Sequence, residues 1–191
     1  LGFDDSGEIL YMTDSRGRNT AALKAINTRS GAVTTVAEDA KADAGGVMAD
    51  PKTGRVQAVN FEFDRSKWKV VDPSIQPDLD ALKLVADGEL TVGSRTLDDS
   101  KWIAAYMLDN GPVKIYLYDR ATKKATYLFS NSKALDSQPL VKMIPVIIKS
   151  RDGLDLVSYL TLPPGSDADN NGIPDQPVPM VLNVHGVPWA R

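Results

Sequence analysis

The segment "DADNNGIPD" carries oxygen-bearing groups at a spacing that could hold a calcium ion. The ligands it offers are, in order, Asp167, Asp169, Asn171, the backbone carbonyl of Ile173, and Asp175. Gly172 stands at the sixth position, where such a loop turns sharply. Val178 takes the twelfth position, which in an EF-hand loop carries a bidentate glutamate, so we expect weak, structural calcium binding. The alternative is a solvated turn rich in Asp, Asn and Gly.

A second candidate site stands at His185, Gly186 and Val187 in "VLNVHGVPWAR". The near-continuous apolar run before it, residues 178–184, suits a strand buried on both faces. His185 is the single histidine of the sequence. We expect it to be a buried histidine at a strand end, satisfied by backbone hydrogen bonds, in preference to a general base.

The residues needed for acyl transfer by a serine hydrolase are missing from the sequence. None of its 14 glycines begins a Gly-x-Ser-x-Gly motif, the strand-to-helix turn that exposes a nucleophilic serine. A second histidine to act as base is missing as well. The sequence therefore predicts that this chain by itself has no hydrolase activity.

Composition and charge limit the class of protein. The chain has 191 residues, of which 42% are hydrophobic and 25% charged, as in ordinary globular proteins. The formal net charge of -3, with basic and acidic residues interspersed, argues against a nucleic-acid partner. No apolar run approaches the roughly 20 residues of a membrane span. Cysteine is lacking, which excludes disulfides and thiolate metal sites. The sequence begins at Leu1, so we expect any targeting signal to lie upstream.

The elements that must position these residues show an internal repeat. "FDDSGEILYMTD", "ADPKTGRVQAVNFE" and "LDDSKWIAAYMLD" are similar, and their turn positions Gly7, Gly54 and Lys101 recur at intervals of 47 residues. Short strands in units of about 40–50 residues are the signature of β-propeller blades. A β-sandwich with similar turns is the alternative.

The middle unit differs from its neighbours because it contains a helical pattern. Apolar residues recur near helical spacing at Leu79, Leu82, Leu84 and Val85. Asp78 and Asp80 lie near the start of this stretch and Gly88 lies at its end, which is typical helix punctuation. We expect a short helix inserted at the edge of the blade. The tryptophans Trp68, Trp102 and Trp189 are expected to fill blade packing and a strand end.

The pattern changes after Leu140. "MIPVIIKSRDGLDLVSYLTLPPG" reads as two strands around an Asp-Gly turn, a strong hairpin signal. The sequence therefore predicts a boundary near residues 138–145, with a partial propeller over 1–140 and a second domain over 141–191.

The last fifty residues resemble a known family. "SRDGLDLVSYLTLPPG" followed by "VPMVLNVHGVPWAR" is similar to the entry into the catalytic domain of prolyl oligopeptidase-type serine peptidases, which include acylaminoacyl peptidases and dipeptidyl peptidases. In that family a β-propeller precedes an α/β-hydrolase domain. The resemblance covers residues 144–191 tightly and the rest loosely. It implies a mainly β fold, with about three propeller blades followed by the first strands of the hydrolase.

The resemblance assigns roles to the residues at the end of the chain. His185, Gly186 and Val187 match a His-Gly-Gly-Pro motif whose loop supplies a backbone N–H to the oxyanion hole. The nucleophile, acid and base would all follow Arg191, so the resemblance implies a fragment that is inactive alone. Val187 departs from the motif, because a β-branched residue is a genuine outlier at positive φ.

Two functions stay open on this reading. One is part of a serine peptidase that cleaves peptide substrates through an acyl-enzyme, with the propeller restricting access and with no catalytic cofactor. The other is a non-catalytic propeller binding module attached to a degenerate hydrolase, which Val187 favours. We expect no membrane association, and self-association through open strand edges. The calcium-like loop favours a secreted or periplasmic location.

Overall fold

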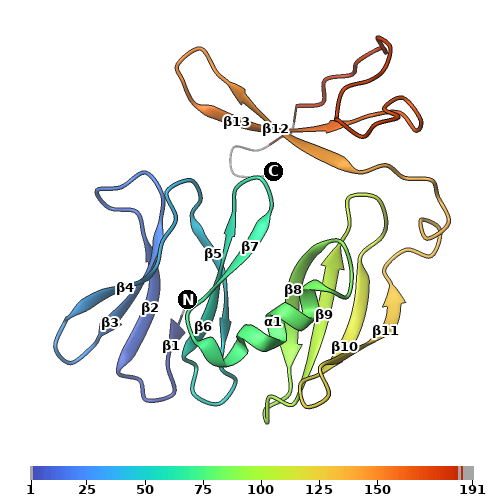
Figure 1. The fold of residues 1–191 in the computed structure, drawn as a ribbon. Helices are drawn as coiled ribbons and strands as arrows, with labels where there is room; N and C mark the ends of the chain where they lie inside the picture. Colours follow the sequence, from blue (N-terminus) through green and yellow to red (C-terminus); the bar gives the residue numbers. More distant parts are fainter. Residues whose placement is uncertain (1, 185, 187–191) are drawn as a thin grey trace.

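The structure is a computed structural model that describes residues 2–184 and residue 186, and it is built mainly from antiparallel β-sheets (Figure 1). The first sheet contains β1 (Gly2–Phe3), β2 (Ile9–Asp14), β3 (Ala22–Asn27) and β4 (Val33–Ala37). The second sheet contains β5 (Ala44–Ala49), β6 (Val56–Glu62) and β7 (Ser66–Val70). The third contains β8 (Glu89–Arg95), β9 (Lys101–Met107), β10 (Lys114–Asp119) and β11 (Lys124–Ser130). In each sheet, strands adjacent in sequence are hydrogen-bonded neighbours.

These three sheets confirm the predicted mainly β fold with about three repeated units. Each is an antiparallel meander, and the three stand side by side in chain order (Figure 1). The arrangement is that of successive propeller blades, and in the described part of the chain the sheets do not close into a ring. None of the helices in the described residues is long and apolar enough to cross a membrane.

The turns between the first two strands of each sheet explain the repeat seen in the sequence. Gly7 and Gly54 both have positive φ, at 69° and 66°, and each lies two residues before the second strand of its sheet. In the third sheet that place belongs to Asp99, with φ of 59°, and not to Lys101 as predicted. The turn hydrogen bonds agree, since Gly7 N donates to Asp4 O and Asp99 N donates to Thr96 O. Aspartate is one of the few side chains that adopt this conformation readily.

The predicted helix is present. A short 3₁₀ turn (Pro73–Ile75) leads into α1 (Gln76–Lys83), which follows β7 where the other two sheets have a fourth strand. It thus continues from β7, the edge strand of the second sheet, as predicted for a helix inserted at the blade edge. Ile75, Leu79 and Leu82 are buried in a core that joins the second and third sheets. Helical spacing puts these side chains on one face, and burying each contributes about 1.5–3 kcal/mol.

Two hydrophobic clusters join the sheets. One lies between the first and second sheets and contains Leu23, Ala37, Ala42, Ala44, Val56, Val59 and Phe61. The other lies between the second and third sheets with α1, and contains Met48, Ala58, Ile75, Leu79, Leu82, Leu90, Trp102, Ala104, Tyr106 and Tyr118. Trp102 is fully buried and Trp68 packs against the same cluster, as expected for blade packing. Trp189 lies outside the described residues.

A network of buried charges runs beside the second cluster. The carboxylate of Asp78, which is fully buried, accepts hydrogen bonds from Arg120 Nη2 at 2.9 Å and Tyr118 Oη at 2.9 Å, and it also pairs with Lys123. Asp99 accepts from Trp102 Nε1 at 2.7 Å.

Arginines connect the two carboxylates of this network and carry it to the second sheet. Asp99 pairs with both Arg95 and Arg120, whose guanidinium groups lie 4.6 and 5.0 Å from the centre of the Trp102 ring. Arg95 Nη1 donates to Gln57 Oε1 of the second sheet at 2.8 Å. Because each buried charge is paired and hydrogen-bonded, the network fixes the second sheet and α1 against the third.

The chain beyond the third sheet forms a separate hairpin. Residues 131–142 lead without a strand from β11 to β12 (Met143–Lys149), which pairs with β13 (Asp155–Thr161) in a two-stranded sheet. The hairpin predicted around Arg151, Asp152 and Gly153 is confirmed, and Gly153 has φ of 88°. The predicted domain boundary near residues 138–145 stays a prediction.

We expect Asp78→Asn to lower the free energy of unfolding by about 3 kcal/mol near pH 7. Removing one partner of a buried ion pair leaves the charge of the other partner buried and unpaired. Burial alone would raise the pKa of Asp78, but the bonds from Arg120, Lys123 and Tyr118 outweigh it and lower this pKa. The stability that the carboxylate contributes is therefore complete above about pH 4 and is lost as pH falls through the lowered pKa. Denaturant unfolding at several pH values should show the two proteins converging in acid.

Asp80→Asn is the matched control for this change. Asp80 lies on the same helix, but its side chain is 57% exposed and faces Lys83 at 3.5 Å. Exposed pairs of this kind contribute about 0–1 kcal/mol. Equal losses in the two variants would contradict the role assigned to the buried network.

A second prediction concerns Gly54, whose turn packs against the start of the chain. A Cβ at Gly54 would lie 3.0 Å from Asp4 Cα, whereas one at Gly7 would meet nothing within 4 Å. Both positions have positive φ, so Gly7→Ala should cost about 1 kcal/mol of strain. Gly54→Ala adds a backbone clash and should cost about 3 kcal/mol. Thermal unfolding of the two variants measures the difference, and equal melting temperatures would show that the clash relaxes.

Candidate functional site

The apolar run before the predicted oxyanion loop does not form the buried strand that its sequence predicts. Residues 178–184 have no strand assignment, and the side chains of Met180, Val181, Leu182 and Val184 are largely exposed. A central strand of an α/β sheet needs strands on both sides to accept its backbone hydrogen bonds. The described part of the chain provides none beside this segment. The prediction that this segment is buried came from its residue types alone, and that prediction is wrong for this structure.

Of the three oxyanion-loop candidates, the structure describes Gly186 alone. Gly186 is exposed and lies in a bend. A Cβ added to it would meet no atom of the described residues within 4 Å. His185 and Val187 lie outside the described residues, so their predicted roles stay predictions.

The aspartates of the predicted calcium loop bind the loop's own amides. Asp167 accepts hydrogen bonds from Asn171 N at 3.0 Å and Gly172 N at 2.8 Å. Asp169 accepts from the side-chain amide of Asn171 at 2.9 Å, and Asn171 Oδ1 accepts from Ile173 N at 2.7 Å. The sharp turn at Gly172, with φ of 81°, is as the sequence predicts.

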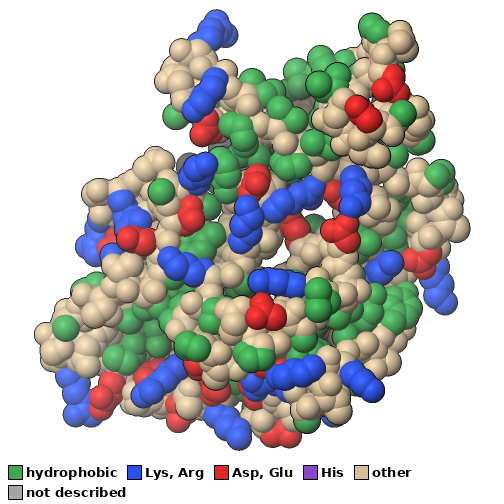
Figure 2. Space-filling view, viewed as in Figure 1, with side chains coloured by type: hydrophobic (Ala, Val, Ile, Leu, Met, Phe, Trp, Pro, Cys, Tyr) green, Lys and Arg blue, Asp and Glu red, His purple; other side chains and the backbone are tan. Residues whose placement is uncertain are grey.

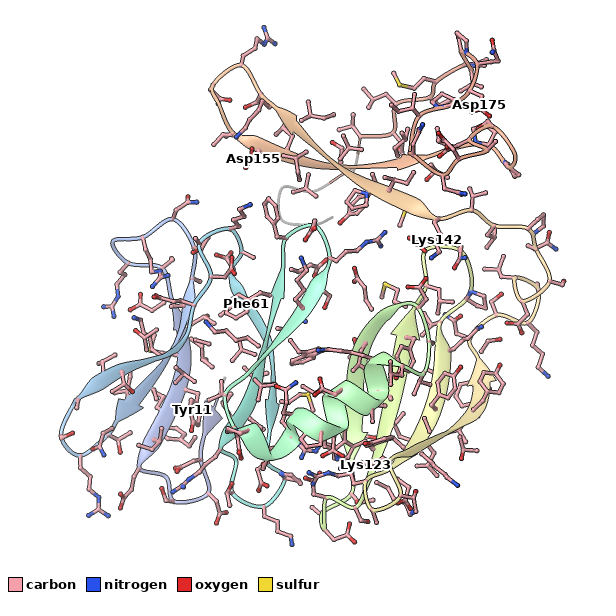
Figure 3. All side chains as sticks on the ribbon, viewed as in Figure 1. Tyr11, Phe61, Lys123, Lys142, Asp155 and Asp175 are labelled. Atoms are coloured by element: carbon pink, nitrogen blue, oxygen red, sulfur yellow. The ribbon has the colours of Figure 1, made fainter. Side chains whose placement is uncertain are left out.

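Asp175 closes the same loop from its far end, near the β12–β13 hairpin (Figure 3). Its carboxylate accepts from Ala168 N at 3.2 Å, and its backbone N donates to Ser166 O at 2.7 Å. Across residues 2–184 and Gly186, no three acidic or histidine side chains gather closely enough to hold a metal ion. The loop is thus ordered by its own hydrogen bonds, and calcium binding stays a prediction.

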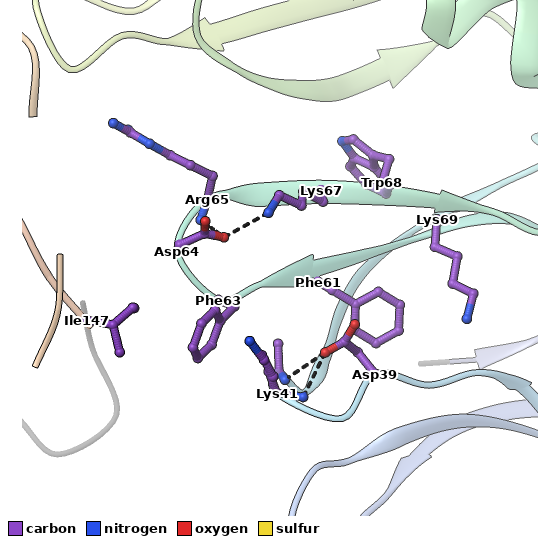
Figure 4. A pocket seen from close by; sticks show the side chains of 11 residues that line it. Asp39, Lys41, Phe61, Phe63, Asp64, Arg65, Lys67, Trp68, Lys69 and Ile147 are labelled. Carbon is purple, nitrogen blue, oxygen red and sulfur yellow. Dashed lines mark hydrogen bonds and ion pairs between the residues drawn. The ribbon is translucent and has the colours of Figure 1, made fainter. Parts of the chain in front are cut away.

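A cavity that the sequence analysis did not predict lies between the sheets and β12. It has a volume of about 400 Å³ and is lined by Asp39, Lys41, Ala42, Phe61, Phe63, Asp64, Arg65, Lys67, Trp68, Lys69 and Ile147 (Figure 4). Most of these residues come from the β6–β7 hairpin. The mixture of aromatic and charged residues in "FEFDRSKWK" is the sequence feature that marks this hairpin.

The charges around this cavity are largely engaged with neighbours. Lys67 Nζ pairs with Asp64 at 2.9 Å, and Asp39 accepts from the backbone N of Lys41 at 2.8 Å (Figure 4). The hydrogen bond from Lys67 is the largest cause that lowers the pKa of Asp64 below its usual range. Lys41 Nζ stands 5.0 Å from the centre of the Phe63 ring, a cation–π contact. The lining residues include no nucleophile paired with a base.

Comparison with known proteins identifies the relatives of this chain. It is 54% identical over 190 residues to dipeptidyl aminopeptidase BIII of Pseudoxanthomonas mexicana, covering 100% of the chain and 28% of that relative. It is 31% identical over 166 residues to dipeptidyl peptidase family member 6 of Caenorhabditis elegans, covering 79% of the chain and 22% of that relative. The chain thus spans less than a third of either relative's length. No family model matches it.

A solved structure shows the same fold. The chain matches one from a structural and mechanistic study of two prolyl endopeptidases with a TM-score of 0.56, over 80% of this chain and 22% of that one. The sequence identity is 15%, so this likeness concerns the fold alone. The two dipeptidyl peptidase relatives show that the chain belongs to the prolyl oligopeptidase family of peptidases, of which it matches a part, and the shared fold agrees with this.

Proposed function

We propose that this chain is a working part of a serine peptidase that cleaves peptide bonds through an acyl-enzyme. The observation that carries the proposal is the 54% identity, across 190 residues, to a dipeptidyl aminopeptidase. The proposed substrates are peptides, from which the intact enzyme removes dipeptides as the relatives' names imply. No cofactor is needed for this chemistry, because the serine, its base and the oxyanion donors suffice.

In this proposal the three sheets restrict access to the catalytic centre and the end of the chain contributes to it. The cavity under β12 lies on the side of the sheets that faces the hairpin, which supports a role in admitting peptide segments. Gly186 belongs to the loop that would present a backbone N–H to the oxyanion. Removing one such donor typically costs about 3–4 kcal/mol of transition-state stabilisation.

The second candidate is a propeller binding module joined to a hydrolase that has lost activity. The observation that favours it is Val187, which stands where the family motif has a second glycine. A β-branched side chain resists the positive φ that glycine adopts freely. On this alternative the propeller surface would still bind peptides, but no acyl-enzyme would form.

An activity assay on two proteins tests the proposal. We expect the longer gene product that contains this chain to release a chromophore from a dipeptide conjugate and to be labelled by a fluorophosphonate. The 191-residue chain alone should do neither, because its sequence lacks a nucleophile elbow and a second histidine. A serine in the chain that is labelled, with turnover abolished by its mutation, would refute the inactivity of the chain. An unlabelled, inactive longer protein would instead favour the binding module.

We also propose that the loop from Asp167 to Asp175 binds calcium weakly. The clustered carboxylates repel one another, and a divalent cation would relieve that repulsion. Binding requires Asp169 and Asn171 to exchange their present hydrogen bonds for the ion, so affinity should be low, roughly 10⁻⁴–10⁻³ M. Such an ion would order the connection after β13 and would not take part in catalysis. Self-association through exposed strand edges likewise stays a prediction.

Isothermal titration of calcium into the metal-free chain measures this affinity. We expect heat of binding in the wild type and its loss in an Asp167→Ala, Asp169→Ala double variant. Asp155→Ala is the control, because that carboxylate lies in β13, outside the loop, and pairs with Lys149. Identical heats in the wild type and the double variant would show that the loop is a polar turn without a metal.

A further inference from the structure

The loop after β13 contains one of the two Asn-Gly pairs in the sequence, which are Asn110–Gly111 and Asn171–Gly172. At such a pair the backbone nitrogen of glycine can attack the asparagine side chain and expel ammonia, because glycine has no Cβ to hinder the approach. Asn171 is exposed, and Figure 2 shows acidic side chains at the upper right of the view, where the loop after β13 lies. The groups around each pair decide whether this reaction is assisted.

Asp167 is placed to take the proton from the attacking nitrogen. Its Oδ2 accepts a hydrogen bond from Gly172 N at 2.8 Å. A general base must lie within hydrogen-bond reach, about 2.6–3.2 Å, of the atom whose proton it removes. A second hydrogen bond, from Asn171 N to Oδ1 at 3.0 Å, holds the same carboxylate in place. Asp167 can therefore accept the Gly172 proton while the nitrogen forms its new bond.

The backbone of Ile173 holds and polarises the carbonyl that is attacked. Asn171 Oδ1 accepts from Ile173 N at 2.7 Å, and this hydrogen bond closes a turn whose ring of atoms includes both Asn171 Cγ and Gly172 N. Negative charge develops on Oδ1 when Cγ is attacked, and a backbone N–H aimed at that oxygen stabilises the charge. The Ile173 amide is thus an oxyanion donor for a reaction within the loop.

Asp169 contacts the nitrogen that must leave. Asn171 Nδ2 donates a hydrogen bond to Asp169 Oδ2 at 2.9 Å. This carboxylate favours the positive charge that Nδ2 gains when it is protonated before it departs. The base, the oxyanion donor and the contact to the leaving group all come from residues 167–173, so the arrangement is internal to the loop.

The other Asn-Gly pair lacks these groups. Asn110–Gly111 is followed by Pro112, which has no backbone N–H to donate to the asparagine side chain. The neighbouring carboxylate, Asp109, accepts hydrogen bonds from Arg65 and from the backbone N of Met143 instead. The two pairs have the same reacting atoms and different surroundings, so the second pair is an internal reference for the first.

We propose that Asn171 is a site of self-modification, at which the loop converts this residue to a succinimide and then to isoaspartate or aspartate. Asp167 takes the Gly172 proton while the bond from Gly172 N to Asn171 Cγ forms. The bond from Cγ to Nδ2 then breaks, and Nδ2 leaves as ammonia with that proton. Water opens the succinimide ring, so water is consumed, ammonia is released and neither an oxidant nor a reductant is needed.

The product changes both the charge and the backbone of the loop. Either acid places a further carboxylate beside those of Asp167 and Asp169, and isoaspartate also lengthens the backbone by a methylene group. The hydrogen bond from Asn171 Nδ2 to Asp169 is lost, and repulsion between like charges replaces it. The connection after β13 therefore becomes less ordered as the protein ages.

Peptide mapping by mass spectrometry tests the proposal without any activity. The longer gene product that contains this chain is kept folded at neutral pH in metal-free water enriched in heavy oxygen, which enters the side chain when the succinimide opens. Synthetic peptides that span each Asn-Gly pair give the rates without the fold. We expect Asn171 to react about tenfold faster or more in the folded protein than in its peptide, because a general base and an oxyanion donor assist it. Asn110 should react no faster in the protein than in its peptide.

The comparison with the peptide separates self-modification from ordinary deamidation. Without assisting groups, folding restricts the approach of the glycine nitrogen, and the pair then reacts no faster in the protein than in the free peptide. A rate for Asn171 equal to or below its peptide rate would therefore overturn the proposal, whatever the outcome of the peptidase assay.

Asp167→Asn keeps the size of the side chain but removes the base. We expect it to slow the reaction of Asn171 about tenfold or more and to leave that of Asn110 unchanged. Asp175→Asn is the matched control, because that carboxylate closes the same loop on Ala168 N and makes no hydrogen bond to the reacting pair. Equal slowing in the two variants, or slowing in neither, would contradict the role of Asp167 as the base.

Discussion

Two buried carboxylates constrain the whole arrangement. Asp78 of α1 and Asp99 of the β8–β9 turn sit in the protein interior, where an unpaired charge is very costly, so each must be met by a cation in good geometry. Arg120 meets both, and Arg95 meets Asp99 while it also reaches Gln57 of the second sheet. These contacts tie the helix and the second sheet to the third.

The chain is consequently held together in two different ways. The three sheets share hydrophobic clusters and buried, paired charges, and every buried side-chain nitrogen and oxygen in the described residues has a hydrogen-bond partner. Within residues 143–184, the β12–β13 hairpin and the segment after it have neither a shared hydrophobic cluster nor a common strand ladder with those sheets. Contacts that are few and polar give a lower free energy of local opening than a packed core does.

The comparisons fit this division. A solved prolyl endopeptidase chain shares the fold at 15% identity, because alternating strands and short turns can be encoded by many sequences. The 54% identity to a dipeptidyl aminopeptidase runs through the whole chain. It therefore includes both the sheets and the hairpin region, so the relation of the chain to peptidases does not depend on one motif.

Local features could be read from the sequence because their causes lie within a few residues. The strands of the three sheets, the helix at Gln76–Lys83 and the hairpin around Gly153 follow from alternation, helical spacing and turn residues. The resemblance at residues 144–191 also led to the correct family. The repeat was found too, although its third turn was placed two residues late. At that turn Asp99 stands in place of a glycine, and its carboxylate accepts a hydrogen bond from the buried Trp102.

Long-range pairing was decided by the tertiary structure alone. Asp78 reads as a helix-start residue, yet its main partner, Arg120, comes from the far end of β10. Nothing near Arg65 in the sequence indicates Asp109 or Met143, and the cavity beside it forms only when the β6–β7 hairpin meets β12. The apolar run at residues 178–184 has the composition of a buried strand, but burial depends on neighbouring strands. Residue types determine what a segment can become, and the contacts it finds in space determine what it is.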